Sequence, residues 1–318
     1  MGYPSYLQLY RDGTLEDRIR EAGELLADCT VCPQECRVNR LEGELGICRV
    51  GAKARIASYG PHFGEEAPLV GEHGSGTIFF EGCNLLCVFC QNCDISHIDK
   101  LGDASAQAVD HEQLAEIMLG LQERQCHNIN LVTPSHVVPQ ILAALPAAIE
   151  RGLHLPLVYN SSGFDSVDTL CLLEGIVDIY MPDCKFISPA AAKRYTRARN
   201  YPEAMMKAVR EMHRQVGDLK IDARGLAVRG LLVRHLVMPG HPDETEGILD
   251  FLANEISVKT YLNLMDQYRP CHEAFGIPPI DRPLSAEEYR QAMEMAEHRG
   301  LTNLDQRDWK RIMRLLGI

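Results

Sequence analysis

Three cysteines fall within eight residues, where Cys83, Cys87 and Cys90 follow the spacing C-x3-C-x2-C. Thiolates this close together can hold one iron–sulfur cube, each on a different iron, which leaves the fourth iron open to a substrate or cofactor. A structural zinc ion normally takes four protein ligands, so a run of three does not favour a closed zinc site. Cys93 lies three residues further on, and we interpret it as a non-ligand. The alternative for the whole run is a set of buried core cysteines.

A second group of cysteines lies near the N-terminus in the spacing C-x2-C-x3-C-x11-C, formed by Cys29, Cys32, Cys36 and Cys48. Four thiolates at this spacing predict either a tetrahedral zinc site or a second iron–sulfur cluster, and the spacing alone does not choose between them. A cluster here would serve electron relay or substrate anchoring. The alternative is a structural site that stabilises a short segment with little core of its own.

The composition limits the classes of protein to which the chain can belong. Its 318 residues carry a net charge of −12 and are 46% hydrophobic, as in soluble globular proteins. The negative charge argues against nucleic acid and anionic membrane surfaces as partners. No apolar stretch approaches the ~20 residues that a membrane span needs, and the N-terminal residues lack a signal-peptide pattern. We therefore expect a cytoplasmic protein whose 12 cysteines are reduced.

Short apolar strands alternate with helical segments from residue 77 onward. We expect strands at 77–80, 128–132, 155–159, 177–181, 231–237 and 260–264. Between and after them we expect helices at 107–124, 138–148, 167–173, 203–216, 245–256, 285–298 and 308–316, with a small hairpin at 219–227. Residues 14–27 predict an earlier helix, and 60–76 an irregular connection. Six strands, each followed by a crossover, predict a parallel sheet of the α/β class.

Polar residues follow most of these strands directly. They are Cys83, Thr133-Pro134-Ser135-His136, Asn160-Ser161-Ser162, Asp183-Cys184-Lys185 and Asp266-Gln267-Tyr268. Carboxyl ends of parallel strands carry the functional site, and five such groups on one rim favour a partial (β/α)6 barrel over an open sheet. We expect a cysteine-rich N-terminal module at 1–60, the barrel at 61–283 and a C-terminal helical cap at 284–318. Alternation along the chain points Cys184 away from Asp183 and Lys185, into the barrel wall.

Several motifs together resemble the radical S-adenosylmethionine (SAM) superfamily, and most of all its pyruvate formate-lyase activating enzymes. They are the cysteine run with its approach Gly74-Ser75-Gly76-Thr77-Ile78-Phe79-Phe80-Glu81-Gly82-Cys83, Met181-Pro182-Asp183-Cys184-Lys185, and Arg234-His235-Leu236-Val237-Met238-Pro239-Gly240. The resemblance covers roughly residues 60–282. It is specific for the superfamily and less specific for the reaction.

The resemblance implies a role for each matching residue. Cys83, Cys87 and Cys90 would hold a [4Fe-4S] cluster whose open iron chelates the amino and carboxylate groups of SAM. Lys185 would pair with that carboxylate, and Arg234 would lie near the carboxylate or ribose. A monovalent cation would bind the Met181 carbonyl, Asn160, Ser161 and Asp183. The family's second strand usually ends in a Gly-Gly-Glu-Pro-like turn that supports the SAM amino group. This chain instead has Thr133-Pro134-Ser135-His136.

The resemblance also implies a reaction and partners. Reductive cleavage of SAM gives a 5′-deoxyadenosyl radical that abstracts hydrogen, with reduced flavodoxin or ferredoxin as electron donor. The leading expectation is a glycyl-radical enzyme as the partner that is activated. One alternative is radical modification of a small molecule or peptide. Another, of a different class, is a non-catalytic iron–sulfur electron-transfer protein, which would have no use for Asp183, Lys185 or Arg234.

Overall fold

The structure is a computed structural model that describes residues 4–98 and 107–305. Its strands are β1 (Ala54–His62), β2 (Ser75–Phe80), β3 (Gln107–Val109), β4 (Ile129–Val132), β5 (Leu157–Ser161), β6 (Ile179–Pro182), β7 (Lys220–Ile221), β8 (Ala227–Leu236) and β9 (Tyr261–Met265). The six strands expected from the sequence correspond to β2, β4, β5, β6, β8 and β9. The predicted helix at 308–316 lies outside the described residues.

Helices fill the crossovers. They are α1 (Tyr6–Arg11), α2 (Thr14–Glu24), α3 (Ala67–Val70), α4 (Cys93–Ser96), α5 (His111–Glu123), α6 (Val138–Glu150), α7 (Val167–Leu172), α8 (Pro189–Tyr195), α9 (Tyr201–Val216), α10 (Pro242–Phe251) and α11 (Ala286–His298), with 3₁₀ turns at Arg40–Glu42 and His272–Ala274. A π-helical turn, Leu252–Ile256, continues α10. No helix in the described ranges is both long and apolar enough to cross a bilayer.

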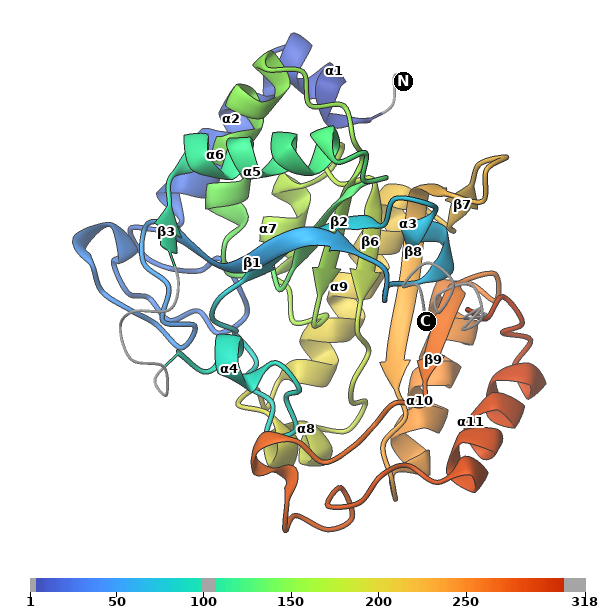
Figure 1. Ribbon diagram of the computed structural model, residues 1–318. Coiled ribbons are helices and arrows are strands. Elements are labelled where there is room, and N and C mark those ends of the chain that lie inside the picture. The colour runs from blue at the N-terminus through green and yellow to red at the C-terminus, as the bar shows by residue number, and fades with distance from the viewer. Residues whose placement is uncertain (1–3, 99–106, 306–318) are drawn as a thin grey trace.

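The sheet runs in the order β3-β1-β2-β4-β5-β6-β8, and β7 and β9 each pair with β8. From β2 to β9 all the main ladders are parallel, which confirms the predicted α/β class with a parallel sheet. Within the described residues no ladder joins β9 back to β2, so the barrel is incomplete. Figure 1 shows the parallel arrows pointing toward the same end of the molecule, with helices outside them.

Two antiparallel strands extend the sheet beyond β2, and the sequence reading missed both. β1 pairs with β2 over Ile56–His62 and with β3 over Ala54–Ile56. The predicted irregular connection at 60–76 is therefore wrong at both ends, because β1 continues to His62 and β2 begins at Ser75. The predicted helix at 107–124 begins too early. Gln107–Val109 is a strand, and Asp110 then forms a capping box with Gln113 that starts α5.

The N-terminal segment packs onto the barrel helices. α1 contacts α2, and α2 contacts α6 and α7. Tyr6 is fully buried, and its hydroxyl donates to the Leu155 carbonyl at 2.8 Å. β1 crosses residue 60, where we expected the first module to end, and joins this segment to the sheet. The division into three units remains a prediction.

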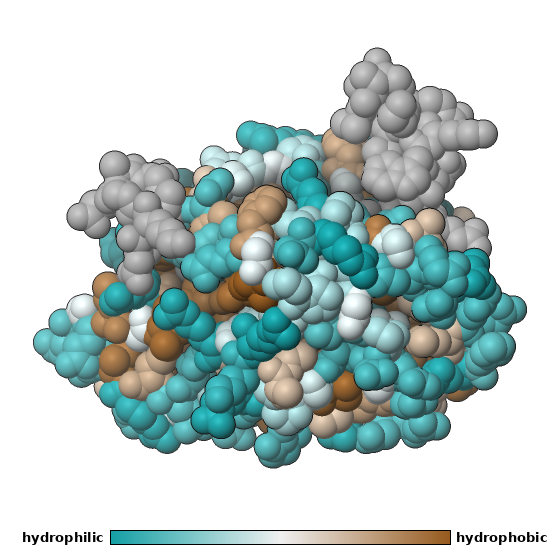
Figure 2. All heavy atoms as spheres, turned by 90° about the horizontal axis from the view of Figure 1, so that it is seen from below, coloured by the Kyte–Doolittle hydropathy of each residue, from teal (hydrophilic) through white to brown (hydrophobic). Residues whose placement is uncertain are grey.

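The end of the molecule to which the parallel strands point carries a hollow. Viewed from that side, hydrophobic atoms lie deep near the centre of a mostly polar face (Figure 2). The loops that follow β2, β4, β5, β6, β8 and β9 all reach this end. The fold therefore brings the polar groups that follow the strands to one face.

Candidate functional site

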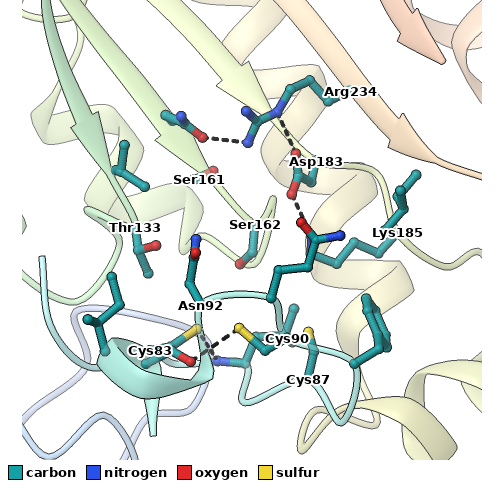
Figure 3. Close-up of a pocket in the computed structure, with 18 of the residues that line it drawn as sticks. Cys83, Cys87, Cys90, Asn92, Thr133, Ser161, Ser162, Asp183, Lys185 and Arg234 are labelled. Atoms are coloured by element: carbon teal, nitrogen blue, oxygen red, sulfur yellow. Dashed lines mark hydrogen bonds and ion pairs between the residues drawn. The ribbon is translucent and has the colours of Figure 1, made fainter. Parts of the chain in front are cut away.

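A cavity of about 250 Å³ opens at the carboxyl ends of the parallel strands. Nine of the residues that the sequence predicts to bind the cluster or the cofactor line this cavity. They are Cys83, Cys87, Cys90, Thr133, Asn160, Ser161, Asp183, Lys185 and Arg234. They come from five separate segments, which are the loop after β2 and the tips of β4, β5, β6 and β8. Figure 3 shows the three cysteine sulfurs at one side of the cavity and Asp183 with Arg234 at the other.

The cysteine loop begins with a turn that requires glycine. Gly82 has φ +79°, and a Cβ there would lie 2.3 Å from the Cys48 carbonyl oxygen. Leu86 also has a positive φ, 51°, so the chain turns tightly between Cys83 and Cys87. The Val88 N–H donates to the Tyr195 carbonyl at 3.0 Å, which fixes the loop to α8. The loop is thus held in a shape that puts all three cysteines on one cavity.

The local hydrogen bonds of the cysteines suit thiolates. The Leu85 N–H donates to Cys83 Sγ at 3.3 Å, and Cys90 Sγ lies 3.2 Å from Ser96 Oγ. Burial raises the pKa of the Cys83 and Cys87 thiols, although the charge of Lys185 opposes this rise. Without a positive partner the thiols therefore stay protonated, and a bound metal centre is the kind of partner that deprotonates them.

The cysteine spacing fits a cluster better than a single ion. Among the residues that the structure describes, no three or more His, Cys, Asp or Glu side chains are placed so that they could hold a metal ion. In an iron–sulfur cube each thiolate binds a different iron, so the sulfurs stand further apart than the ligands of one ion. Cys93 does not line the cavity, as expected for a non-ligand.

Opposite the cysteines lies a triad of charged side chains on two neighbouring strands. Asp183, directly after β6, accepts from Lys185 Nζ at 2.5 Å and from Arg234 Nε at 2.6 Å. Arg234 Nη2 also donates to Asn160 Oδ1 at 2.6 Å. Burial alone would raise the pKa of Asp183, but Arg234 and Lys185 together hold it below its ordinary value. Lys185 and Arg234 both line the cavity, so two cationic side chains are placed to pair with an anionic ligand group.

The triad is supported from behind by acidic residues of the segment before α3. Glu65 Oε2 lies 3.8 Å from Arg234 Nη1, and Glu65 Oε1 lies 3.0 Å from His62 Nδ1. Glu66 accepts from Asn263 Nδ2 at 2.7 Å, and burial raises the pKa of Glu66. Neither glutamate lines the cavity. The structure therefore places both glutamates behind Arg234.

The loop that carries Lys185 is held by two residues that sequence reasoning did not select. The Lys185 N–H donates to Tyr201 Oη at 2.9 Å, and Tyr201 in turn donates to the Asp183 carbonyl at 2.9 Å. Glu244 of α10 accepts from the Ile187 N–H at 2.6 Å. No sequence signal marks these helix residues, since a tyrosine and a glutamate on amphipathic helices are ordinary.

The remaining predicted residues divide into two groups. Thr133 lines the cavity at a strained φ of 59°, whereas Ser135 is buried and is not part of the lining. Ser161 Oγ donates to Asp165 at 2.6 Å. The oxygens of Asn160 and Asp183 already accept from cationic side chains, so the structure gives the expected monovalent cation no support. That expectation remains a prediction.

Other lining residues were not predicted as ligands of the metal or the cofactor. These are chiefly Asn92, Ser162, Leu236, Met265 and Gln267. Cys184 is fully buried in the hydrophobic core and does not line the cavity, which confirms that it points into the barrel wall. His136 and Tyr268 are both buried, and the Tyr268 hydroxyl donates to the Ile280 carbonyl at 2.6 Å. Neither lines the cavity.

The N-terminal cysteines gather around a second, smaller cavity. All four of them line it, together with Val31, Gln34, Arg40, Gly46, Ile47, Asn84 and His136. Cys29, Cys32 and Cys48 are buried, and Cys36 is partly exposed. The prediction that these four residues form one site is therefore consistent with their placement, while the identity of a ligand remains a prediction.

Comparisons with known proteins give one clear relative. No protein-family model matches the sequence. The uncharacterized protein MJ0674 of Methanocaldococcus jannaschii is 33% identical over 294 residues, which are 92% of this chain and 80% of that protein.

Solved structures give weaker likenesses. Streptococcus suis SuiB bound to S-adenosylmethionine has a TM-score of 0.46 at 11% identity, over 70% of this chain and 47% of that one. SuiB bound to its precursor peptide SuiA has a TM-score of 0.44 at 11% identity, over 68% and 43%. The FeFe-hydrogenase maturase HydG from Carboxydothermus hydrogenoformans has a TM-score of 0.44 at 12% identity, over 74% and 54%. The chain spans about half the length of each, and likenesses this weak carry no argument about activity.

Proposed function

We propose that this protein, which belongs to the same family as the uncharacterized protein MJ0674, is a radical SAM enzyme. The observation that supports this most is the shared cavity. Cys83, Cys87 and Cys90 line one side of it, and the Lys185–Asp183–Arg234 triad lies across from them. A plain electron-transfer protein needs the cysteines but has no need of a paired set of partly buried charges in the same cavity.

The cysteine set fits a [4Fe-4S] cluster with an open iron, because three thiols line the cavity and Cys93 does not. When bound, the cluster and SAM supply one-electron cleavage of the sulfonium and a 5′-deoxyadenosyl radical that removes hydrogen from a C–H bond. The contribution of the protein is to bind, orient and shield the reactants.

Lys185 and Arg234 are the residues that would bind the carboxylate of SAM. Both are held in place by Asp183, and burial strengthens charge-assisted hydrogen bonds to a carboxylate. The pKa of Lys185 is raised, because Asp183 outweighs the opposing effect of burial, so its ammonium stays charged at neutral pH. Thr133, at the tip of β4, offers a hydroxyl to the amino group, where the family's usual turn is missing.

Apolar side chains also line part of the cavity. Phe80, Leu236 and Met265 reach it from β2, β8 and β9. They offer a surface for an adenosine group and keep water from the reacting carbon. Radical chemistry needs this exclusion, because a carbon radical takes hydrogen from any competing donor within reach.

For the target of the radical, we propose a glycine of a partner enzyme, as in the pyruvate formate-lyase activating enzymes whose motifs the chain resembles. Reduced flavodoxin or ferredoxin is the proposed electron donor. The alternative to a glycine target is that the same radical modifies a peptide or a small molecule.

The test is anaerobic incubation of the iron-loaded protein with dithionite and SAM, followed by quantification of 5′-deoxyadenosine and methionine. Radical SAM chemistry yields both in equal amounts, and none with Cys87→Ala. Absence of both products from the wild-type protein, despite a reducible cluster, would favour an electron carrier. Adding cell extract then identifies the target. A glycyl-radical EPR doublet in a protein fraction supports the activase, whereas hydrogen loss from a peptide or metabolite contradicts it.

A further inference from the structure

The second cavity contains a buried positive charge beside its four cysteines. Arg40 is only 1% exposed, and its Nη1 lies 3.9 Å from Cys29 Sγ and donates to the His136 carbonyl at 2.8 Å. Its Nε and Nη2 both donate to the Gly51 carbonyl. No carboxylate in the described part of the chain forms an ion pair with Arg40. A buried guanidinium needs a counter-charge, and four metal-bound thiolates supply one.

The backbone around Cys36 approaches its sulfur closely. The Ile47 N–H donates to Cys36 Sγ at 3.4 Å. A Cβ at Gly46 would lie 2.7 Å from the same sulfur, so only glycine allows the loop to pass this near. Peptide N–H donors directed at cysteine sulfur are a common feature of iron–sulfur sites, where they tune the reduction potential.

The cavity that these cysteines line has more free space than a closed zinc site would leave. Zinc–sulfur bonds of about 2.3 Å would bring the four sulfurs into contact around the ion. The cavity instead has about 10 Å³ of free space, close to what one water molecule needs. All four cysteines lie in the described part of the chain, and no three of them are placed so that they could hold one metal ion. Both observations fit a multi-iron cluster whose cysteines bind different irons.

The two cysteine cavities share a wall. Cys83 lines the first cavity, while its neighbour Asn84 lines the second. Gly82, directly before them, packs against the Cys48 carbonyl so closely that no side chain fits between. Gln34 Nε2 adds a bond to the Asn84 carbonyl at 2.7 Å. One stretch of backbone therefore separates the two sets of cysteines.

We propose that Cys29, Cys32, Cys36 and Cys48 hold a [4Fe-4S] cluster and form the entry point for electrons. Cys36 is partly exposed, so this site is accessible to an external donor. One electron leaves a reduced donor of the flavodoxin or ferredoxin class, passes through this site and reaches the site of Cys83, Cys87 and Cys90. The donor is oxidised by one electron, and no bond or proton changes hands. The relay rests on the proposed function, whereas the identity of the metal does not.

Metal analysis of a Cys83→Ala/Cys87→Ala/Cys90→Ala variant tests the second site alone. After anaerobic reconstitution with iron, sulfide and zinc, we expect about four irons and no zinc per chain, and an EPR signal on reduction that SAM does not change. One zinc without iron, or no metal at all, would overturn the proposal. If wild-type protein fails to cleave SAM while this variant keeps its irons, the proposed function fails and the metal assignment stands.

A charge variant tests the role of Arg40. Arg40→Met removes a buried positive charge next to the sulfurs, so the reduction potential of the second site should fall relative to wild type. Arg20→Met, on an exposed helix position, is the matched control and should leave the potential unchanged. A potential unaffected by Arg40→Met would contradict the placement of a redox centre in this cavity.

The relay is tested by a ratio of two rates. In Cys36→Ser, SAM cleavage driven by reduced flavodoxin should fall at least about tenfold relative to cleavage driven by dithionite, a small reductant that can reach the first site directly. An unchanged ratio in a variant that has lost the second site's iron would exclude the relay.

Discussion

The two cysteine cavities differ in what surrounds the sulfurs. The first is a roomy cavity at the strand tips that also contains three partly buried charged side chains. The second cavity is small. Among the described residues that line it, Arg40 is the only buried side chain with a permanent charge. Free space and charged groups for a ligand accompany the three cysteines, whereas little free space accompanies the four. In each cavity the number of cysteines therefore fits the surroundings: three stand beside free space, and four stand beside almost none. These surroundings fit the ligand that we propose for the first site and the metal centre that we propose for the second.

The largest expected effect comes from removing a cysteine of the first cavity. Cys87→Ala should abolish 5′-deoxyadenosine formation, because one iron loses its thiolate and the cluster no longer assembles stably. Iron content and product yield measure the effect. Cys93→Ala is the matched control, since Cys93 lies close by but does not line the cavity. Equal losses of iron and of product in the two variants would contradict the assignment of Cys87 as a ligand and Cys93 as a non-ligand.

Replacing the glycine of the shared wall should damage both cavities together. Gly82→Ala adds a Cβ 2.3 Å from the Cys48 carbonyl at φ +79°, so the two loops must separate. We expect iron to be lost from both sites and the thermal midpoint to fall. Gly225→Ala is the control, because its φ is +81° with nothing within 4 Å. It should cost only the backbone strain of about 1–2 kcal/mol. Similar behaviour of the two variants would contradict the shared wall.

Removing a cation of the triad should weaken SAM binding without loss of iron. Lys185→Gln removes a charge-assisted hydrogen bond worth about 1.5–3 kcal/mol, so the Kd for SAM should rise about 10- to 100-fold. Lys193→Gln, at an exposed position of α8, should leave the Kd unchanged. Equilibrium dialysis of the reconstituted protein measures both. Wild-type affinity in Lys185→Gln would remove the triad from the ligand site.

The smallest expected effect is on the groups behind the triad. Hydrogen bonding to Glu65 raises the pKa of His62, so His62 stays protonated above the ordinary value of about 6.5. The stabilisation from this pair is therefore fully present below that value and is lost as the pH rises through the raised pKa. NMR titration of His62 should show the raised pKa in wild type and a lower one in Glu65→Gln. Identical titration curves would show that the two side chains do not pair.

Much of this fold could be predicted from the sequence. The six parallel strands carry enough apolar residues to be recognised, and the polar groups after them meet at one end because parallel strands share direction. β1 and β3 were missed because their pairing is tertiary: β1 contains Gly60 and Pro61, and β3 has three residues. Neither has a local pattern of its own.

The candidate site was predictable only where a motif marks it. The cysteine run and Asp183-Cys184-Lys185 can be recognised in the sequence from their residue types and spacing. The support that Tyr201 and Glu244 give to the Lys185 loop depends on long-range packing. The burial of Arg40 beside the N-terminal cysteines was equally invisible, since an arginine eight residues before Cys48 reads as a surface residue. Residue spacing identifies the candidate ligands, whereas the charged side chains beside them are found only in the structure.

The most direct test of the account is electron–nuclear double resonance on the reduced protein with SAM labelled with ¹⁵N at its amino group. The Cys29→Ser/Cys32→Ser/Cys36→Ser/Cys48→Ser variant removes the signal of the second site, and wild type is measured beside it. We predict a ¹⁵N coupling to the cluster of Cys83, Cys87 and Cys90, together with a changed EPR spectrum. A spectrum that SAM leaves unchanged in both proteins, with no ¹⁵N coupling, would contradict an open iron in this cavity.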